Sequence, residues 1–286
     1  MLKIAMHPLQ HSRPYPRPPA TPQEKNALWQ LVRRNDARAL EDFLADNLLA
    51  VNWRLNGHTA LETAVTNKNL PCIKMLLRYG ANPNTLSDDG KASPLLLAAR
   101  GNNAQVLITL LHNRAQLHPA QNGEITPVIA AVESNATTTL AILLSHGAPY
   151  STLDGEGQAA LHIATQKGHF DAAKLLLDKG ENIDQRNAES LTPLMLAAKE
   201  RNLPAAKFLI ENGADENLRC DLRETPLEIA RAFANGDTDF LRGFENLIFE
   251  RYKRAAAGLG PGMHAGTARP IAPQKTVRFN KHGPRP

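Results

Sequence analysis

The sequence predicts an all-α array in which helix–turn–helix units repeat along the chain and stack side by side. Three observations lead to this prediction. A Thr/Ser-x-Leu-x-x-Ala pattern occurs six times, with alanine as its first residue in one copy, and successive copies begin 34 or 33 residues apart. An alanine stands five positions after each start, and a pair of large aliphatic residues such as Leu76-Leu77 follows in five of the six units. The six starting residues are Thr59, Ser93, Thr126, Ala159, Thr192 and Thr225.

A hydroxyl residue followed by proline and leucine predicts where the first helix of a unit begins, as at Ser93-Pro94-Leu95 and Thr192-Pro193-Leu194. The hydroxyl oxygen can accept a hydrogen bond from a free backbone N–H, and proline at the first helical position loses no hydrogen bond. A glycine such as Gly80 predicts the end of the second helix, because it tolerates positive φ. Arg114 occupies this position in the second unit, where we expect backbone strain.

The turn between the two helices of a unit also needs a residue that tolerates a left-handed backbone. Gly168 supplies it in the fourth unit. Asparagine is the next best residue for this conformation. We therefore expect it at four other turns, namely at Asn69, Asn102, Asn135 and Asn202.

The segment Ala159–Ala164 followed by Gly168-His169, and the segment Thr192–Ala198, resemble the ankyrin repeat. The resemblance covers about residues 24–255 and implies an ankyrin-repeat solenoid whose units are joined by β-turn or hairpin loops. We expect disordered tails on both sides of the array, because they contain too few large apolar residues to fold. The expected divisions are a Pro-rich leader at 1–23, a cap at 24–56, repeats at about 57–89, 90–122, 123–155, 156–188 and 189–221, a capping unit at 222–255, and a basic tail at 256–286.

The histidine position of the family is kept only at His162, and the resemblance implies a structural hydrogen bond there. In the other units the position holds Glu62, Leu96, Ile129, Met195 and Glu228. We therefore expect the hydrogen-bonded link between neighbouring first helices to be broken at several joints, and the stability of the array to be uneven.

The two ends of the array are expected to act as caps. Residues 26–31 and 40–44 predict a degenerate first helix pair, and residues 239–251 predict an amphipathic final helix. This helix is expected to pack against the last repeat; the alternative is a hydrophobic helix that binds a partner. Its apolar residues are Phe240, Phe244, Leu247 and Ile248.

Cysteine usage and the absence of long apolar runs predict a soluble, cytoplasmic protein. Cys72 and Cys220 fall in the first and the last units, too far apart for a disulfide, so we expect free thiols and a reducing compartment. The first residues lack the apolar run of a secretory signal, and nowhere do 18 apolar residues follow one another. No membrane partner is expected. Delivery into a host cell stays open if the source is bacterial.

The net charge of +5 is concentrated in the tails. Residues 1–23 carry +3 and residues 256–286 carry +5, neither with an acidic residue, which leaves −3 for the segment between them. Binding to phosphates needs basic residues gathered on one face. We therefore do not expect the array to bind nucleic acid.

Two short motifs lie in the tails. Arg13-x-x-Pro16-x-x-Pro19 fits a ligand of polyproline-binding domains, but short proline motifs often match by chance, and we favour a solvated proline-rich leader. Lys275-Thr-Val277-Arg-Phe279 resembles the motif with which regulatory subunits dock on protein phosphatase 1. The resemblance implies that Val277 and Phe279 enter two apolar pockets of the phosphatase and that Lys275 lies near an acidic rim of the same site. The alternative is a chance match to a loose five-residue pattern.

The sequence predicts neither catalysis nor a cofactor. Glu62 and Glu228 lie in the same repeat position five units apart, so they do not form an acid–base pair. The remaining histidines lack the spacing and the cysteine partners of a zinc site. We find no Gly-rich phosphate loop and no nucleophile with a nearby base. Solenoids act mainly through extended concave surfaces, which favours a binding protein.

The resemblance implies that a partner protein contacts the turn before each unit and the seventh and eighth positions after its start. Charges of both signs alternate there, so a partner of one charge is not expected. Trp53 is either an aromatic anchor for the partner or a cover for the first stacking joint. The expected groove residues are Trp53, Asn56, His58, Thr66, Asn67, Asp89, Arg100, Glu133, Gln158, Gln166, Lys167, Glu189, Lys199 and Glu200.

Three functional hypotheses follow. The first is a non-enzymatic adaptor or scaffold that binds a partner protein through the ankyrin groove. The second is a targeting subunit that docks a protein phosphatase 1-type catalytic subunit through residues 275–279. The third is an ankyrin-repeat effector that an intracellular bacterium delivers to act on host proteins.

Overall fold

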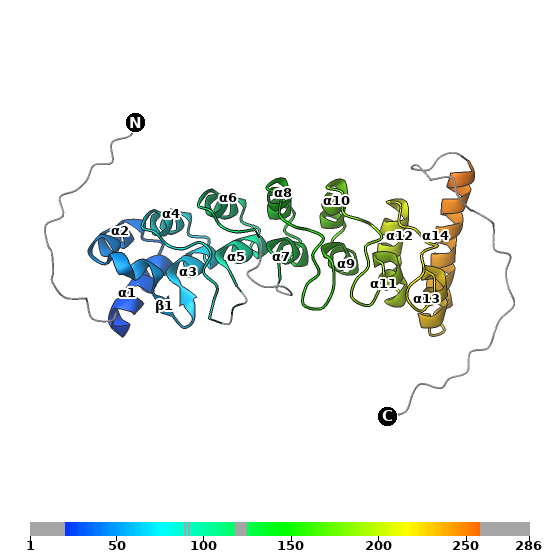
Figure 1. Ribbon diagram of the computed structural model, residues 1–286, viewed down its shortest axis with the longest axis horizontal. Helices are drawn as coiled ribbons and strands as arrows, with labels where there is room; N and C mark the ends of the chain where they lie inside the picture. Colours follow the sequence, from blue (N-terminus) through cyan, green and yellow to red (C-terminus); the bar gives the residue numbers. More distant parts are fainter. Residues whose placement is uncertain (1–20, 89, 91, 118–124, 258–286) are drawn as a thin grey trace, which may run out of the picture.

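The computed structural model describes residues 21–88, 90, 92–117 and 125–257. Within these residues the chain forms a row of helix pairs in two layers, with the first helix of each pair in one layer and the second helix in the other (Figure 1). The first helices are α1 (Pro22–Arg33), α3 (Ala60–Thr66), α5 (Pro94–Arg100), α7 (Pro127–Glu133), α9 (Ala160–Gln166), α11 (Pro193–Lys199) and α13 (Pro226–Phe233). The second helices are α2 (Ala37–Asp46), α4 (Leu70–Arg78), α6 (Ala104–His112), α8 (Thr137–Ser145), α10 (Phe170–Asp178), α12 (Leu203–Glu211) and α14 (Thr238–Ala256). This confirms the predicted all-α repeat array.

Hairpin loops connect successive units on the side of the first helices. A short 3-10 helix, η1 (Leu48–Asn52), leads from α2 into the first hairpin, where β1 (Arg54–Leu55) pairs antiparallel with β2 (His58–Thr59). In the fourth unit a single antiparallel bridge joins Leu153 to Ala159. These two loops therefore take the hairpin form that the sequence predicted.

The predicted starts of the first helices are confirmed. In five units the starting hydroxyl accepts a hydrogen bond from the backbone N–H three residues later, and in the fourth unit Ala159 has no side-chain cap. The capping residues are Thr59, Ser93, Thr126, Thr192 and Thr225. Arg114 adopts the left-handed conformation expected of it, with φ of 66°.

Two of the four predicted turn asparagines are wrong. Asn102 and Asn135 have positive φ as expected, but in the first and fifth units Lys68 and Arg201 take this conformation instead, with φ of 58° and 57°. The sequence had assigned the left-handed conformation to the next residues, Asn69 and Asn202, which instead precede the first residues of α4 and α12.

Those two asparagines occupy the position of His169, not that of Gly168, and have a different role. Each side chain donates a hydrogen bond to a carbonyl oxygen of the preceding unit. Asn69 donates to Val32 over 2.5 Å, and His169 lies 2.8 Å from the oxygen of Val132. Asn202 donates to the oxygen of Gln166 over 3.3 Å. These side chains therefore tie the first, fourth and fifth units to the units before them.

Buried aliphatic and alanine side chains fill the space between units. The alanine five positions after each start is at most 4% exposed in all six units, which lets neighbouring first helices stack closely. The buried side chains form two clusters, one from Leu28 to Leu176 and one from Leu191 to Ile248. Cys72 and Cys220 are both buried free thiols, as predicted, and burial raises the pKa of Cys72 to about 11.

The N-terminal helix pair is longer than the sequence predicted, but it covers the first repeat as expected. A capping box at Thr21 and Glu24 starts α1. The buried Trp29 donates a hydrogen bond from Nε1 to Oγ1 of Thr63 over 3.0 Å, which links α1 to α3.

The C-terminal helix α14 covers the other end. It buries Phe240, Phe244 and Ile248 against the last cluster, and Leu247 packs partly buried beside them, as predicted. Arg251 adds a polar contact, because its guanidinium lies 2.6 Å from the carboxylate of the buried Glu216 and also donates to the backbone oxygen of Ala214. Breaking a buried ion pair leaves one charge unpaired and costs several kcal/mol.

We predict that Arg251→Ala lowers the free energy of unfolding by about 3 kcal/mol, because it strands the Glu216 carboxylate in the core. Urea unfolding followed by circular dichroism measures the change. Arg254→Ala is the matched control, since Arg254 is exposed on the same helix and its loss should cost less than about 0.5 kcal/mol. Equal costs for the two variants would contradict this role of Arg251.

Candidate protein-binding surface

The hairpin tips and the ends of the first helices lie along the array on the side away from the second helices (Figure 1). We call this surface the groove face; it consists of the tips and of the seventh and eighth positions after each unit start. Among the predicted residues, those that are exposed are Asn56, His58, Thr66, Asn67, Arg100, Gln166, Lys167, Glu189 and Glu200. Those that are half-buried are Trp53, Glu133, Gln158 and Lys199. Asp89 lies outside the described residues.

Several of the charged side chains on this face pair with one another. Arg100 lies 3.6 Å from Glu133 in the next unit, and Lys199 lies 2.6 Å from Glu189. Exposed pairs of this kind contribute less than about 1 kcal/mol each. They nevertheless cancel much of the charge, which agrees with the expectation that no partner of a single charge fits this face.

The Gln166 side chain donates a hydrogen bond to the carboxylate of Glu200 in the next unit. The two side chains border a narrow recess between α9 and α11, whose floor includes Pro193, Leu196 and Ala197. Lys167, at the adjacent eighth position, is exposed and makes no hydrogen bond or ion pair with the described part of the chain. The middle of the groove face thus presents an exposed cation beside the contact between Gln166 and Glu200.

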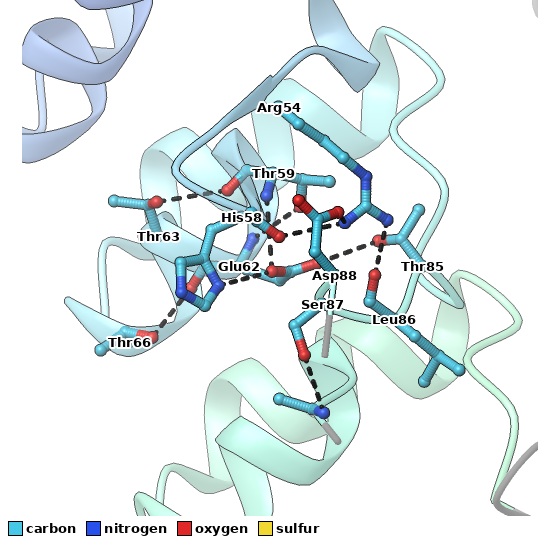
Figure 2. A network of polar contacts seen from close by, with 12 residues as sticks. Arg54, His58, Thr59, Glu62, Thr63, Thr66, Thr85, Leu86, Ser87 and Asp88 are labelled. Atoms are coloured by element: carbon cyan, nitrogen blue, oxygen red, sulfur yellow. Dashed lines mark hydrogen bonds and ion pairs between the residues drawn. The ribbon is translucent and has the colours of Figure 1, made fainter. Parts of the chain in front are cut away.

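An arginine clamps the first hairpin to the second (Figure 2). The guanidinium of Arg54 donates to the backbone oxygen of Gly57 in its own hairpin over 3.0 Å, and to that of Leu86 in the next over 2.5 Å. It also forms an ion pair with Asp88 at 2.6 Å. Because backbone oxygens of both hairpins accept from one side chain, the two loops are held in a fixed relative position.

The same device occurs at the other end of the array. Arg186 donates to the oxygen of Ser190 in its own hairpin over 3.3 Å, and to that of Arg219 in the next over 2.5 Å. The carboxylate of Asp221 lies 3.6 Å from the guanidinium of Arg186, as that of Asp88 lies near Arg54 in the first clamp. Sequence reasoning missed these clamps, although an alignment of the units places both arginines five or six residues before a unit start.

Glu62 preserves a link that the sequence predicted to be lost. Its carboxylate is buried, accepts from the backbone N–H of Thr59 over 3.4 Å, and lies 3.1 Å from Nδ1 of His58 (Figure 2). The hydroxyl of Thr85, in the loop that leads to the next unit, donates to its other oxygen over 3.4 Å. The joint is therefore bridged by an acceptor in the position where the family uses histidine.

His162 makes the predicted structural hydrogen bond. Its Nε2 lies 3.0 Å from the backbone oxygen of Leu191 in the next unit, and burial lowers the pKa of the imidazole. The ring is thus neutral and donates its proton to this carbonyl. It is held inside the joint and is not part of the groove face.

Trp53 packs inward, which favours the second of its two interpretations. Its ring stands edge-on to Phe43, with 6.4 Å between ring centroids, and packs against the core. It covers the joint between the N-terminal pair and the first repeat. The exposed large apolar residues of the hairpins and first-helix ends lie in later units, at Leu153, Leu222 and Phe233.

Two residues of the last unit were missed in the sequence. Phe233 stands at the eighth position after Thr225, in the row of Asn67 and Lys167, and is 41% exposed. Leu222 stands at the tip of the preceding hairpin and is 80% exposed. Comparing equivalent positions of all six units would have found both, because the other units carry polar residues or glycine there.

The described residues contain no group of three or more His, Cys, Asp or Glu side chains placed to hold a metal ion. No helix among them combines the length and the apolar character needed to span a bilayer. The docking motif at Lys275, Val277 and Phe279, and the proline motif at residues 13–19, lie outside the described residues.

The model of ankyrin repeats matches this chain in three copies, at residues 67–154, 95–187 and 128–221, which together span more than half of it. The chain belongs to the ankyrin-repeat family. It is 28% identical over 97 residues to the Notch-regulated ankyrin repeat-containing proteins of Xenopus tropicalis and Homo sapiens, a match that covers 32% of this chain and 83% of each relative.

Two solved ankyrin domains show the same fold. The human ASB11 ankyrin repeat domain matches with a TM-score of 0.65 at 22% identity, over 77% of this chain and 96% of that domain. The ankyrin repeat domain of Bcl-3, a member of the IkappaB protein family, matches with a TM-score of 0.62 at 24% identity, over 75% of this chain and 97% of that domain.

Within this ankyrin array, neighbouring hairpins also bond through their backbones. The N–H of Ala188 donates to the oxygen of Gly157 over 2.8 Å, as the N–H of Asp88 does to that of Gly57 over 3.1 Å. Gly157 has φ of 76°, and a Cβ added to it would overlap the Cβ of Ala188. Glycine is therefore needed here for its conformation and for the close approach of the next hairpin.

We predict that Gly157→Ala destabilises the array by more than Gly147→Ala does, and increases amide exchange at Ala188. Gly147 has almost the same φ, 77°, but open space around the added Cβ. The control thus carries only the left-handed strain of alanine, about 1–2 kcal/mol, and the difference reports the hairpin contact. Equal costs in urea unfolding, with unchanged exchange at Ala188, would contradict the prediction.

Proposed function

We propose that this ankyrin-repeat protein is a non-enzymatic adaptor that binds a partner protein through its groove face. The observation that carries the proposal is the series of solvent-facing side chains at equivalent positions of successive units, which ends in the exposed aromatic ring of Phe233. A rigid stack that presents one such position per unit suits an extended protein surface better than a small molecule.

The composition of the groove face supports this proposal. Aromatic and large aliphatic anchors contribute most of the binding energy in protein interfaces, and polar neighbours exclude water around them. Phe233 and Leu222 provide apolar anchors in the last unit, and Lys167 provides an unpaired charge near the middle. The Arg54 and Arg186 clamps hold the hairpins before binding, which lowers the entropy cost of association.

The phosphatase-targeting hypothesis is a separate proposal that depends on the sequence of residues 275–279. Such a segment would dock by adding a strand to a sheet edge, with Val277 and Phe279 in pockets. It is compatible with the adaptor role, because the groove face would then hold the protein to which the phosphatase is brought. The two proposals are separated by testing the groove face and the tail independently.

We predict that p-benzoylphenylalanine in place of Lys167 or Phe233 cross-links a partner protein in lysate, whereas the same residue in place of Lys207 does not. Lys207 is exposed on α12, in the layer of second helices, and serves as the matched position outside the groove face. Capture of the same proteins from all three positions would contradict binding through this face.

With the captured partner purified, Phe233→Ala should weaken binding by about 2 kcal/mol, roughly 30-fold, as expected for an aromatic anchor. Isothermal titration calorimetry measures this loss. Val277→Ala/Phe279→Ala should leave that affinity unchanged and remove only a phosphatase subunit from the set of bound proteins. An unchanged affinity after Phe233→Ala/Leu222→Ala would exclude the last unit as the anchor.

A further inference from the structure

The joint between the fourth and fifth units differs from the other joints of the array. The apolar core divides there, since one cluster ends at Leu176 and the other begins at Leu191. Only partly buried side chains, Ile183 and Phe208, pack against both clusters. In the layer of second helices, α10 and α12 also approach each other over a shorter length than α8 and α10 or α12 and α14 do.

A carboxyl group is buried at this joint. Glu181 follows α10 at a position where the other repeats carry a buried alanine, and it is 5% exposed. Neither of its carboxyl oxygens has a hydrogen-bond partner among the described residues. Burial raises its pKa from 4.5 to about 8, so the group is mostly protonated at neutral pH. The equivalent alanines are Ala81, Ala115, Ala148 and Ala214.

No charge on the neighbouring elements compensates an ionised Glu181, because burial is the only cause of its pKa shift. The ionisable groups on the chain segments around it are His146 and Tyr150 before it, Lys174, Asp178, Lys179 and Asp184 on its own unit, Lys207 and Glu211 on α12, and Asp215 and Glu216 in the loop that follows α12. Most of these side chains are exposed, and Lys174 pairs with Asp178 at 3.3 Å. Ionised Glu181 is therefore stable at this position only if water hydrates its carboxylate.

The two edges of the joint are held differently. On the side of the hairpins and first helices, several polar contacts cross it: His162 to Leu191, Ala188 to Gly157, Asn187 to Gln158, Gln166 to Glu200, and Asn202 to Gln166. On the side of the second helices, the rings of Phe170 and Phe208 stack 5.0 Å apart, and Lys174 makes an exposed contact with Asn212 at 3.3 Å. In the loops that follow these helices, the N–H of Asp215 donates to the carboxylate of Asp184 over 3.0 Å. The first edge is thus tied by more directional bonds than the second, and the second edge lies beside the unpaired carboxyl.

We infer that the joint between the fourth and fifth units is a hinge, which opens on the side of the second helices when Glu181 ionises and keeps its hairpin side closed. Opening hydrates the carboxylate at the edge where the core is divided. Opening changes the angle between the fourth unit, which carries Lys167, and the fifth unit, which carries Glu200. The shape of the groove face therefore changes with pH. The inference concerns the array itself and does not depend on the partner.

The direction of the pH dependence follows from linkage. In the closed joint the pKa of Glu181 is raised, and in the open joint it returns toward its ordinary value of 4.5. The open state therefore releases a proton, and its population rises with pH between about 4.5 and 8 and levels off above. Within this window the open-to-closed ratio rises by up to about tenfold per pH unit.

The test is hydrogen–deuterium exchange of the full chain between pH 5 and 9, corrected for the intrinsic pH dependence of amide exchange. We expect opening at the end of α10 and along α12 to increase up to about tenfold per pH unit until about pH 8. Amides of α4 and α6 should show no such increase. Glu181→Gln and Glu181→Ala should remove the slope, and Glu211→Gln, which changes an exposed acid on α12, should keep it.

A persistent slope in both Glu181 variants would overturn the inference, because another group would then control the joint. The same result would follow from a uniform increase of exchange over the whole array, which would indicate global unfolding instead of a hinge. Ala148→Glu tests whether the joint itself matters. It should destabilise the neighbouring joint without producing separate opening there, and an equal local slope at that joint would overturn the role of the divided core.

We also predict that Glu181→Ala stabilises the folded array at pH 7 by roughly 1–3 kcal/mol, because it removes the cost of protonating a buried carboxyl. The gain should shrink as the pH falls toward 4.5, where Glu181 is protonated in both folded and unfolded chains. Chemical unfolding at pH 5 and pH 7.5 measures it. A gain that grows as the pH falls would have the wrong sign and would contradict a raised pKa.

Discussion

The structure depends on one constraint, which is that no single helix pair can bury its own apolar surface. Each unit leaves two apolar faces, and both are covered only when a neighbour stacks on each side. The buried alanine in each first helix sets how closely the neighbours approach, since a larger side chain would hold the helices apart. Stability then arises joint by joint, and a change at one joint acts mainly on its two neighbours.

Joints that share this packing differ in the polar contacts that accompany it. Arg54 and Arg186 clamp the hairpins near the two ends of the array, and Glu62 and His162 bridge the joints that follow their own units. Leu96 and Ile129, in the second and third units, can make no such bridge because their side chains are apolar. The joints therefore differ in their polar links, and the core divides at one of them. The uneven stability expected from the sequence stays a prediction.

The sequence predicted the fold well because each structural position recurs in several units. Repetition shows which residue types a position accepts, and it identified the helix starts, the buried alanines and the capping role of α14. The turn asparagines show the limit of this reasoning. Asn69 and Asn202 were assigned one position too early, because asparagine suits both a left-handed turn and the helix start that follows it. Only the spacing from the unit start distinguishes the two positions.

Residues that depend on a contact between loops could not be predicted in the same way. Arg54 and Arg186 act through backbone oxygens of the next hairpin, and a backbone oxygen leaves no trace in the sequence. Phe233 and Glu181 each differ from the residues at the equivalent positions of the other units, and the sequence shows this difference. Their roles, however, depend on the exposure of Phe233 and the burial of Glu181. The same type of departure, a residue unlike its equivalents, thus marks a proposed anchor on the surface and a buried carboxyl group in the core.

In the last unit, residues at equivalent repeat positions are changed so that no further unit stacks on the array. In the fifth unit Ile210 is buried against the next unit, whereas the equivalent residue of α14 is Glu245, which pairs with Arg231 of α13 at 2.8 Å. A further unit stacked on α14 would have to bury this pair, and removing two charges from water offsets much of the gain from apolar contact. The Arg251–Glu216 pair joins α14 to the fifth unit, where Glu216 replaces residues such as Tyr150 and Ile183 that occupy its position in earlier units. One ion pair therefore fixes where α14 docks, and the other makes its outer face unsuitable for continued stacking.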